Sequence, residues 1–86
     1  MAMPRLDSDA LQVLKYMNAE SRTRKDVLRG GDVMKTLGLT SQRLVEILNQ
    51  LSDQDLVRVH GPRDPDNIDS AVLFVDPANR DFVRSL

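Results

Sequence analysis

Hydrophobic residues recur every three or four positions in two long segments, as they do along the buried side of an amphipathic helix. The first segment covers residues 8–19, and Asp7 or Ser8 at its start is a candidate N-cap. The second covers residues 41–51, with Thr40 or Ser41 as its N-cap. The hydrophobic positions that predict these two helices are Leu11, Leu14, Met17, Leu44, Ile47, Leu48 and Leu51.

A shorter helix is predicted between them, from Asp32 to Leu37. Gly30 and Gly31 interrupt the chain before it, and we interpret this pair as a hinge. Gly38 follows it, and glycine tolerates the left-handed conformation common at helix C-termini. Residues 20–29 are too polar for a regular element, so they are predicted to form a loop with a short extended piece.

The last third of the chain has the alternation and composition of a β-hairpin. Residues 56–60 alternate apolar and polar positions, and residues 70–75 are rich in Val, Leu and Phe. The nine residues between them include two prolines and a glycine, which predicts a turn or mobile loop. A short helical turn is expected after Asp76, because proline is well tolerated near a helix start.

These elements predict an α+β fold that is mainly α-helical, with a small hairpin. Eighty-six residues suffice for a single domain over residues 1–86, and residues 1–7 are expected to be flexible. The predicted core is Leu11, Leu14, Met17, Val33, Leu37, Leu39, Leu44, Ile47, Leu48, Leu51, Leu56, Val59, Phe74 and Phe82.

The composition excludes several classes of function. Hydrophobic residues make up 41% of the chain and charged residues 29%, the balance of a globular protein. With no cysteine and one histidine, the chain offers no zinc-thiolate site, histidine cluster or cysteine nucleophile, so we expect neither an enzyme nor a metal or cofactor. No apolar run approaches the roughly 20 residues that span a bilayer, so a cytoplasmic protein is expected.

The charge is distributed unevenly about a net charge of −1. Residues 1–43 hold eight basic and five acidic residues, whereas residues 44–86 hold four basic and eight acidic residues. The two halves should therefore face different partners. One basic cluster is interpreted as a solvated loop, or as a contact to an acidic partner or to a phosphate backbone: Arg22, Arg24, Lys25 and Arg29.

A short helix, a tight turn with glycine and a longer amphipathic helix form the order of a helix-turn-helix. Between an N-terminal helix and a C-terminal hairpin, this order resembles the winged-helix family of DNA-binding domains. The residues that carry the resemblance are Val33, Leu37, Gly38, Leu39, Thr40, Leu44, Leu48, Leu51 and residues 56–59. It implies a winged helix-turn-helix with three helices, a wing of two or three strands and a short C-terminal helical turn.

The resemblance further implies sequence-specific binding of double-stranded DNA by a small transcriptional regulator, with the third helix in the major groove. Gln42 and Asn49 could each pair with adenine, and Arg43 with guanine. Contacts to the DNA backbone are expected from Thr40, Ser41, Lys35 and Arg58. Glu46 and Asp53 on the same helix face oppose this hypothesis, and an ordinary solvated helix face remains the structural alternative.

A second hypothesis is a winged-helix module that binds another protein through its acidic hairpin loop and C-terminal half. The acidic excess of residues 44–86 supports it. The hairpin also departs from a basic wing, because its two basic residues, Arg58 and Arg63, are set against three aspartates, Asp64, Asp66 and Asp69. A homodimer fits the DNA hypothesis, because two-fold symmetry doubles the base contacts. The sequence holds no long extra helix for dimerisation and leaves the oligomeric state open.

Overall fold

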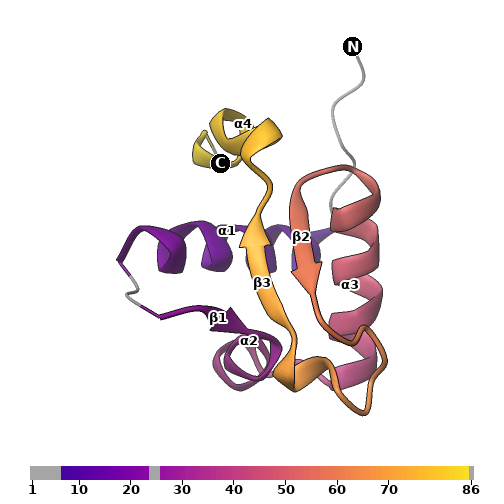
Figure 1. Ribbon diagram of the computed structural model, residues 1–86. Helices are drawn as coiled ribbons and strands as arrows, with labels where there is room; N and C mark the ends of the chain where they lie inside the picture. The colour runs from indigo at the N-terminus through magenta and orange to yellow at the C-terminus, as the bar shows by residue number, and fades with distance from the viewer. Residues whose placement is uncertain (1–6, 24–25, 86) are drawn as a thin grey trace.

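The computed structural model describes residues 7–23 and 26–85. This part of the chain forms four α-helices and one three-stranded antiparallel sheet, an α+β architecture (Figure 1). The helices and strands are α1 (Ser8–Thr23), β1 (Leu28–Arg29), α2 (Gly30–Leu37), α3 (Ser41–Asp53), β2 (Val57–His60), β3 (Val72–Val75) and α4 (Arg80–Arg84). Of residues 1–7, which the sequence predicts to be flexible, residues 1–6 lie outside the described residues, as do Arg24 and Lys25 of the predicted basic cluster.

Helix α1 is longer than its hydrophobic pattern predicts. Its N-cap is Asp7, whose carboxylate accepts a hydrogen bond from the Ala10 N–H at 2.8 Å. It continues past the predicted end at residue 19 to Thr23, so the prediction of a loop was wrong for residues 20–23, whereas the short extended piece predicted within residues 20–29 is found as β1. The last turn is polar and exposed, and its Ser21 and Thr23 hydroxyls donate to backbone carbonyls of the preceding turn. A turn that buries no side chain leaves no hydrophobic periodicity to detect.

The junction of α2 and α3 follows the predicted capping chemistry. Gly38 adopts a φ of 67° at the C-cap of α2, and its N–H donates to the Met34 carbonyl. The Leu39 N–H donates to the same carbonyl at 3.1 Å, which closes the turn. The Thr40 side chain then caps α3 by accepting from the Arg43 N–H at 3.1 Å.

Gly30 and Gly31 form the first turn of α2, so the prediction that they act as a hinge was wrong. The reason for glycine is close approach, because a Cβ at Gly30 would collide with the backbone carbonyl oxygen of Ile68. The Gly30 N–H also donates to the Ala71 carbonyl at 3.0 Å. Helix α2 is therefore fixed at its start to the chain that leads into β3.

The sheet has the strand order β1-β3-β2, with β3 in the centre. Leu28 pairs with Leu73 across β1 and β3, and Val59 pairs with Leu73 across β2 and β3. Helix α1 packs against β3 and α3 packs against β2, so one sheet face is covered (Figure 1). Phe74 points to the other face and is exposed, which makes its prediction as a core residue wrong. Successive residues of a strand point to opposite faces of the sheet, and it is the neighbouring residue Leu73 that is buried.

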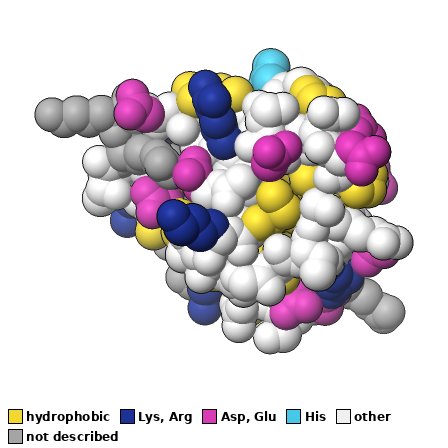
Figure 2. Space-filling view, turned by 90° about the horizontal axis from the view of Figure 1, so that it is seen from below, with side chains coloured by type: hydrophobic (Ala, Val, Ile, Leu, Met, Phe, Trp, Pro, Cys, Tyr) yellow, Lys and Arg dark blue, Asp and Glu magenta, His cyan; other side chains and the backbone are white. Residues whose placement is uncertain are grey.

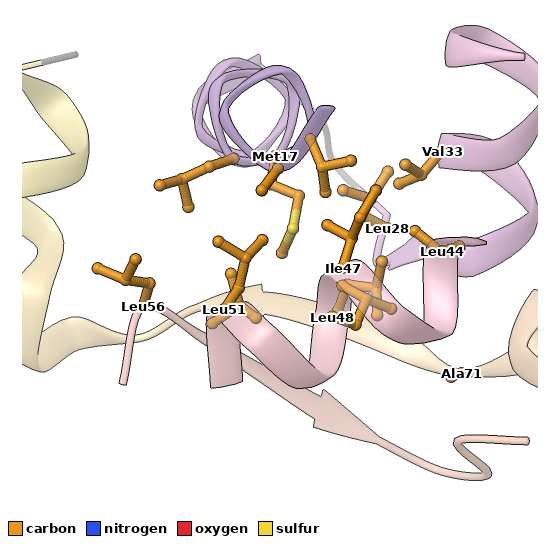
Figure 3. Packing of buried hydrophobic residues seen from close by; sticks show 14 of the residues in the cluster. Met17, Leu28, Val33, Leu44, Ile47, Leu48, Leu51, Leu56 and Ala71 are labelled. Atoms are coloured by element: carbon orange, nitrogen blue, oxygen red, sulfur yellow. The ribbon is translucent and has the colours of Figure 1, made fainter. Parts of the chain in front are cut away.

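The core joins the inner sides of α1, α2 and α3 to the covered sheet face (Figure 3). Eight of the predicted core residues are fully buried: Leu14, Met17, Val33, Leu44, Ile47, Leu48, Leu51 and Leu56. Five others are only partly buried at its edge: Leu11, Leu37, Leu39, Val59 and Phe82. The core also contains buried residues that were not predicted: Ala10, Val13, Leu28, Val57, Ile68, Ala71, Leu73 and Val83.

The loop from β2 to β3 is anchored, although its composition predicts a turn or mobile loop. Ile68 is fully buried and begins a short 3-10 turn, Ile68–Ser70, which packs against α2 and α3. This single hydrophobic residue among prolines and acidic residues has no periodicity, so its burial was not predictable from spacing. The helices of the described residues include none with the length and apolar character needed to cross a membrane.

Candidate nucleic-acid interface

The outward side of α3 carries polar side chains along its whole length. Leu44, Ile47, Leu48 and Leu51 turn inward, and Gln42, Glu46, Asn49 and Asp53 are consequently exposed. No loop of the described chain covers them. The side-chain amides of Gln42 and Asn49 make no hydrogen bond with any described residue, so their donors and acceptors face solvent. This is the surface that the sequence predicts to contact base edges.

The N-terminus of α3 is already capped. The Thr40 hydroxyl oxygen accepts a hydrogen bond from the Arg43 N–H, which would otherwise have no partner within the first turn of the helix. Ser41 is half-buried beside it, and its hydroxyl makes no hydrogen bond within the described chain. Any phosphate contact of Thr40 would therefore use the hydroxyl proton or the backbone rather than replace the cap.

Arg43 lies at the centre of a cluster of three carboxylates. Its guanidinium is 3.1 Å from Asp7 Oδ2, 3.4 Å from Asp9 Oδ2 and 3.4 Å from Glu46 Oε2. Hydrogen bonding to Asp7 is the main cause that raises the pKa of Arg43. The Ala10 N–H, and then Arg43, hold the pKa of Asp7 below its ordinary value. The cluster joins the start of α1 to the first turn of α3.

These carboxylates decide what Arg43 can do. Its side chain is still 36% exposed, so an incoming acceptor can reach it. A guanine held through two hydrogen bonds would have to replace at least one carboxylate, since the carboxylates already use four of the five N–H donors of the guanidinium. Asp7 and Asp9 were not predicted to take part. The N-cap signal of Asp7 was visible in the sequence, whereas a contact 36 residues away leaves no local pattern.

The other two basic residues of the predicted site, Arg58 and Lys35, lie on β2 and α2 rather than on α3. Arg58 is exposed on the sheet face opposite to α3, where it is the cross-strand partner of Phe74. Its Nε donates to Asp76 Oδ2 at 3.3 Å, and Asp76 also accepts from the Ala78 N–H, which is the first cause that lowers its pKa. Lys35 is exposed on α2 and makes no ion pair with a described residue.

The face around α2, the start of α3 and the β2–β3 loop carries both signs of charge. Figure 2 shows acidic side chains interspersed with a few basic ones and no continuous basic patch. In the loop, exposed Arg63 is accompanied by three exposed carboxylates: Asp64, Asp66 and Asp69. Phosphate neutralisation by this loop is correspondingly weak, so α3 carries most of what the surface offers to nucleic acid.

The described residues hold no group of three His, Cys, Asp or Glu side chains arranged to bind a metal ion. Comparison with known proteins found no matching family model, no matching curated protein and no matching solved structure.

Proposed function

We propose that this chain is a winged-helix domain that binds double-stranded DNA sequence-specifically, as a small transcriptional regulator or its DNA-binding part. The order of helix, tight turn and longer helix, followed by a hairpin, supports the fold assignment. In the proposal α3 enters the major groove, and the β2–β3 loop is the wing. The wing contributes little, because its carboxylates outnumber Arg63.

The observation that carries the proposal is the pair of exposed, unbonded amides on α3. Each of Gln42 and Asn49 has the donor and acceptor that match the N7 and N6 edge of adenine. Seven residues of helix span about 10.5 Å, roughly three base-pair steps of about 3.4 Å. A helix lying along the groove would therefore place its two amides at adenines about three base pairs apart.

The carboxylates around Arg43 define the mode of binding. Non-specific affinity for DNA comes from neutralised phosphates, and this face supplies few free cations. Binding to random duplex should consequently be weak, and affinity should depend on base contacts. On the correct site, a guanine would take the place of carboxylates on Arg43, with Glu46 able to accept from a neighbouring cytosine.

Selection of bound duplexes from a random pool, followed by fluorescence anisotropy with the enriched duplex, tests the proposal. We expect Gln42→Ala and Asn49→Ala each to cost about 1–3 kcal/mol of binding and to relax the sequence preference. Gln12→Ala is the matched control, because Gln12 is an exposed amide on α1 and not on α3. If no sequence is enriched, or if all three variants behave alike, the proposal is wrong.

A second candidate is a winged-helix module that binds a basic protein surface through the wing and the C-terminal half. The acidic majority on the β2–β3 loop, together with Glu46 and Asp53 on α3, favours it. A salt titration separates the two functions. A DNA-binding domain binds the selected duplex at low salt and weakens as salt is added, with a shallow slope because it neutralises few phosphates, whereas the protein module does not bind duplex even at low salt.

A further inference from the structure

A groove of about 620 Å³ lies between the C-terminal end of α1, the strands β1 and β3, and α4. None of the residues that line it belongs to α3, so it is separate from the proposed DNA interface. Its volume is within the roughly 300–1,000 Å³ typical of ligand-binding clefts. The groove is large enough for a few side chains of a partner.

The groove is apolar at its base and at one edge. Met17, Leu28 and Leu73 line it and are buried in the core. Val27 and Phe74 also line it and are 45% and 43% exposed; among the described residues, these are the large hydrophobic side chains that remain exposed. His60 packs edge-on against Phe74 with ring centroids 5.2 Å apart, which holds the phenyl ring in place.

Three exposed arginines surround this apolar surface: Arg22 at the end of α1, and Arg80 and Arg84 on α4. Arg80 and Arg84 are four residues apart, so they lie on the same side of α4. None of the three makes an ion pair with a described residue, whereas Arg43 and Arg58 are both paired with carboxylates. Glu20 and Asp26 also line the groove, and the arginines outnumber them.

An apolar strip bordered by guanidinium groups that pair with no described residue is complementary to a segment that carries both apolar side chains and carboxylates. We infer that the groove binds an acidic amphipathic segment of a partner protein, with an apolar side chain of the segment over Phe74 and Val27 and carboxylates on Arg80 and Arg84. Arginine suits this role because its planar fork holds a carboxylate through two parallel hydrogen bonds. The exposed aromatic ring supplies the apolar contact that anchors such interfaces.

This surface gives the molecule two binding sides, since α3 and the groove share no residue. The inference does not rest on DNA binding. If the wild-type protein bound the selected duplex but not an acidic peptide, only the groove inference would be overturned, and the opposite result would overturn only the DNA proposal.

Fluorescence polarisation with a labelled synthetic peptide of about twelve residues, made of Glu, Asp, Leu and Phe, tests the groove. We expect binding at low salt and a loss of about tenfold or more in the double variant Arg80→Glu, Arg84→Glu. Phe74→Ser should weaken binding by a similar factor, because it removes the apolar anchor. The matched control is Arg63→Glu, which reverses an exposed arginine on the β2–β3 loop away from the groove.

Circular dichroism of each variant confirms that the fold is kept, and a peptide in which Lys replaces Glu and Asp should not bind. The inference is overturned if the acidic peptide does not bind, if the lysine peptide binds equally well, or if Arg63→Glu weakens binding as much as the double variant. Concentration-dependent dimerisation that Phe74→Ser abolishes would overturn it in favour of a second copy of this chain on the groove.

Discussion

Single residues in this domain serve two purposes at once, and Asp7 shows it most clearly. One carboxylate oxygen caps α1 through the Ala10 N–H, and the other accepts from Arg43 on α3. Sequence reasoning predicted the cap, because its signal is local, and could not predict the ion pair, whose partners meet only in the folded chain. The requirement for glycine at position 30 could not be predicted either, because it arises from the Ile68 carbonyl, which approaches Gly30 only in the folded chain.

Gly30→Ala should destabilise the protein by about 1–3 kcal/mol, because the added methyl group overlaps a backbone carbonyl that cannot move freely. Gly31→Ala should change stability by less than about 1 kcal/mol, since the nearest atom to its Cβ would be the Asp69 carbonyl oxygen at 3.3 Å. Urea unfolding of the two variants measures the difference. Equal losses at both positions would contradict the close approach at Gly30.

The carboxylate of Asp7, which caps α1, should make the free energy of unfolding depend on pH. Its pKa is lowered in the folded state from an ordinary value of 3.8, so its contribution is complete above that value and is lost as the pH falls through the lowered pKa. Asp7→Asn keeps a capping oxygen but cannot titrate. We expect the free energy of unfolding to fall less between pH 7 and pH 3 in this variant than in the wild type.

The control for this pH effect is Asp53→Asn, because Asp53 forms no ion pair with a described residue. Its dependence on pH should match that of the wild type. If Asp7→Asn behaves like Asp53→Asn, the joint cap and ion pair at the start of α1 does not contribute in this way.

At the scale of elements, helices with a strong apolar stripe were predictable, whereas for β1 the sequence predicted only a short extended piece within residues 20–29, without its ends or its partner strand. The caps and the glycine turn between α2 and α3 follow from local chemistry that the sequence displays. Strand β1 has two residues and exists only because β3 pairs with it. The buried face of β3 was predicted wrongly, because a run of apolar residues does not reveal which of them face the core.

Ile68 is predicted to be the anchor of the β2–β3 loop. Ile68→Ala should cost about 2–5 kcal/mol, the usual range for truncating a fully buried isoleucine, and should make the loop a site of proteolysis. Asp66→Ala, at an exposed position of the same loop, is the control and should change stability by no more than about 0.5 kcal/mol. A loop that stays resistant in both variants would contradict the anchoring role.

At the scale of the whole molecule, the charges are sorted between two sides. The arginines of the groove form no ion pair with a described residue, whereas Arg43 on the outward side of α3 is surrounded by carboxylates. The net charge of −1 conceals this arrangement, and the opposite charges of the two halves of the sequence do not match it, because Arg80 and Arg84 come from the acidic half whereas Asp7 and Asp9 come from the basic half. Which face each charge occupies depends on the tertiary structure.

Asp9→Asn should raise affinity for the selected duplex severalfold, because it removes a carboxylate 3.4 Å from the Arg43 guanidinium without altering the cap of α1. Asp81→Asn makes the same change in net charge on α4, away from α3, and should have little effect. Anisotropy titrations at two salt concentrations compare them. An equal gain in both variants would mean that only overall charge matters.

The most direct test of the account is a two-dimensional NMR titration of the isotope-labelled protein with the selected duplex. We predict that the amide signals of residues 40–50 shift strongly, while those that line the groove, such as Arg22, Phe74 and Arg84, remain in place. Shifts confined to the groove, or no shifts at all, would contradict the assignment of α3 as the DNA-binding helix.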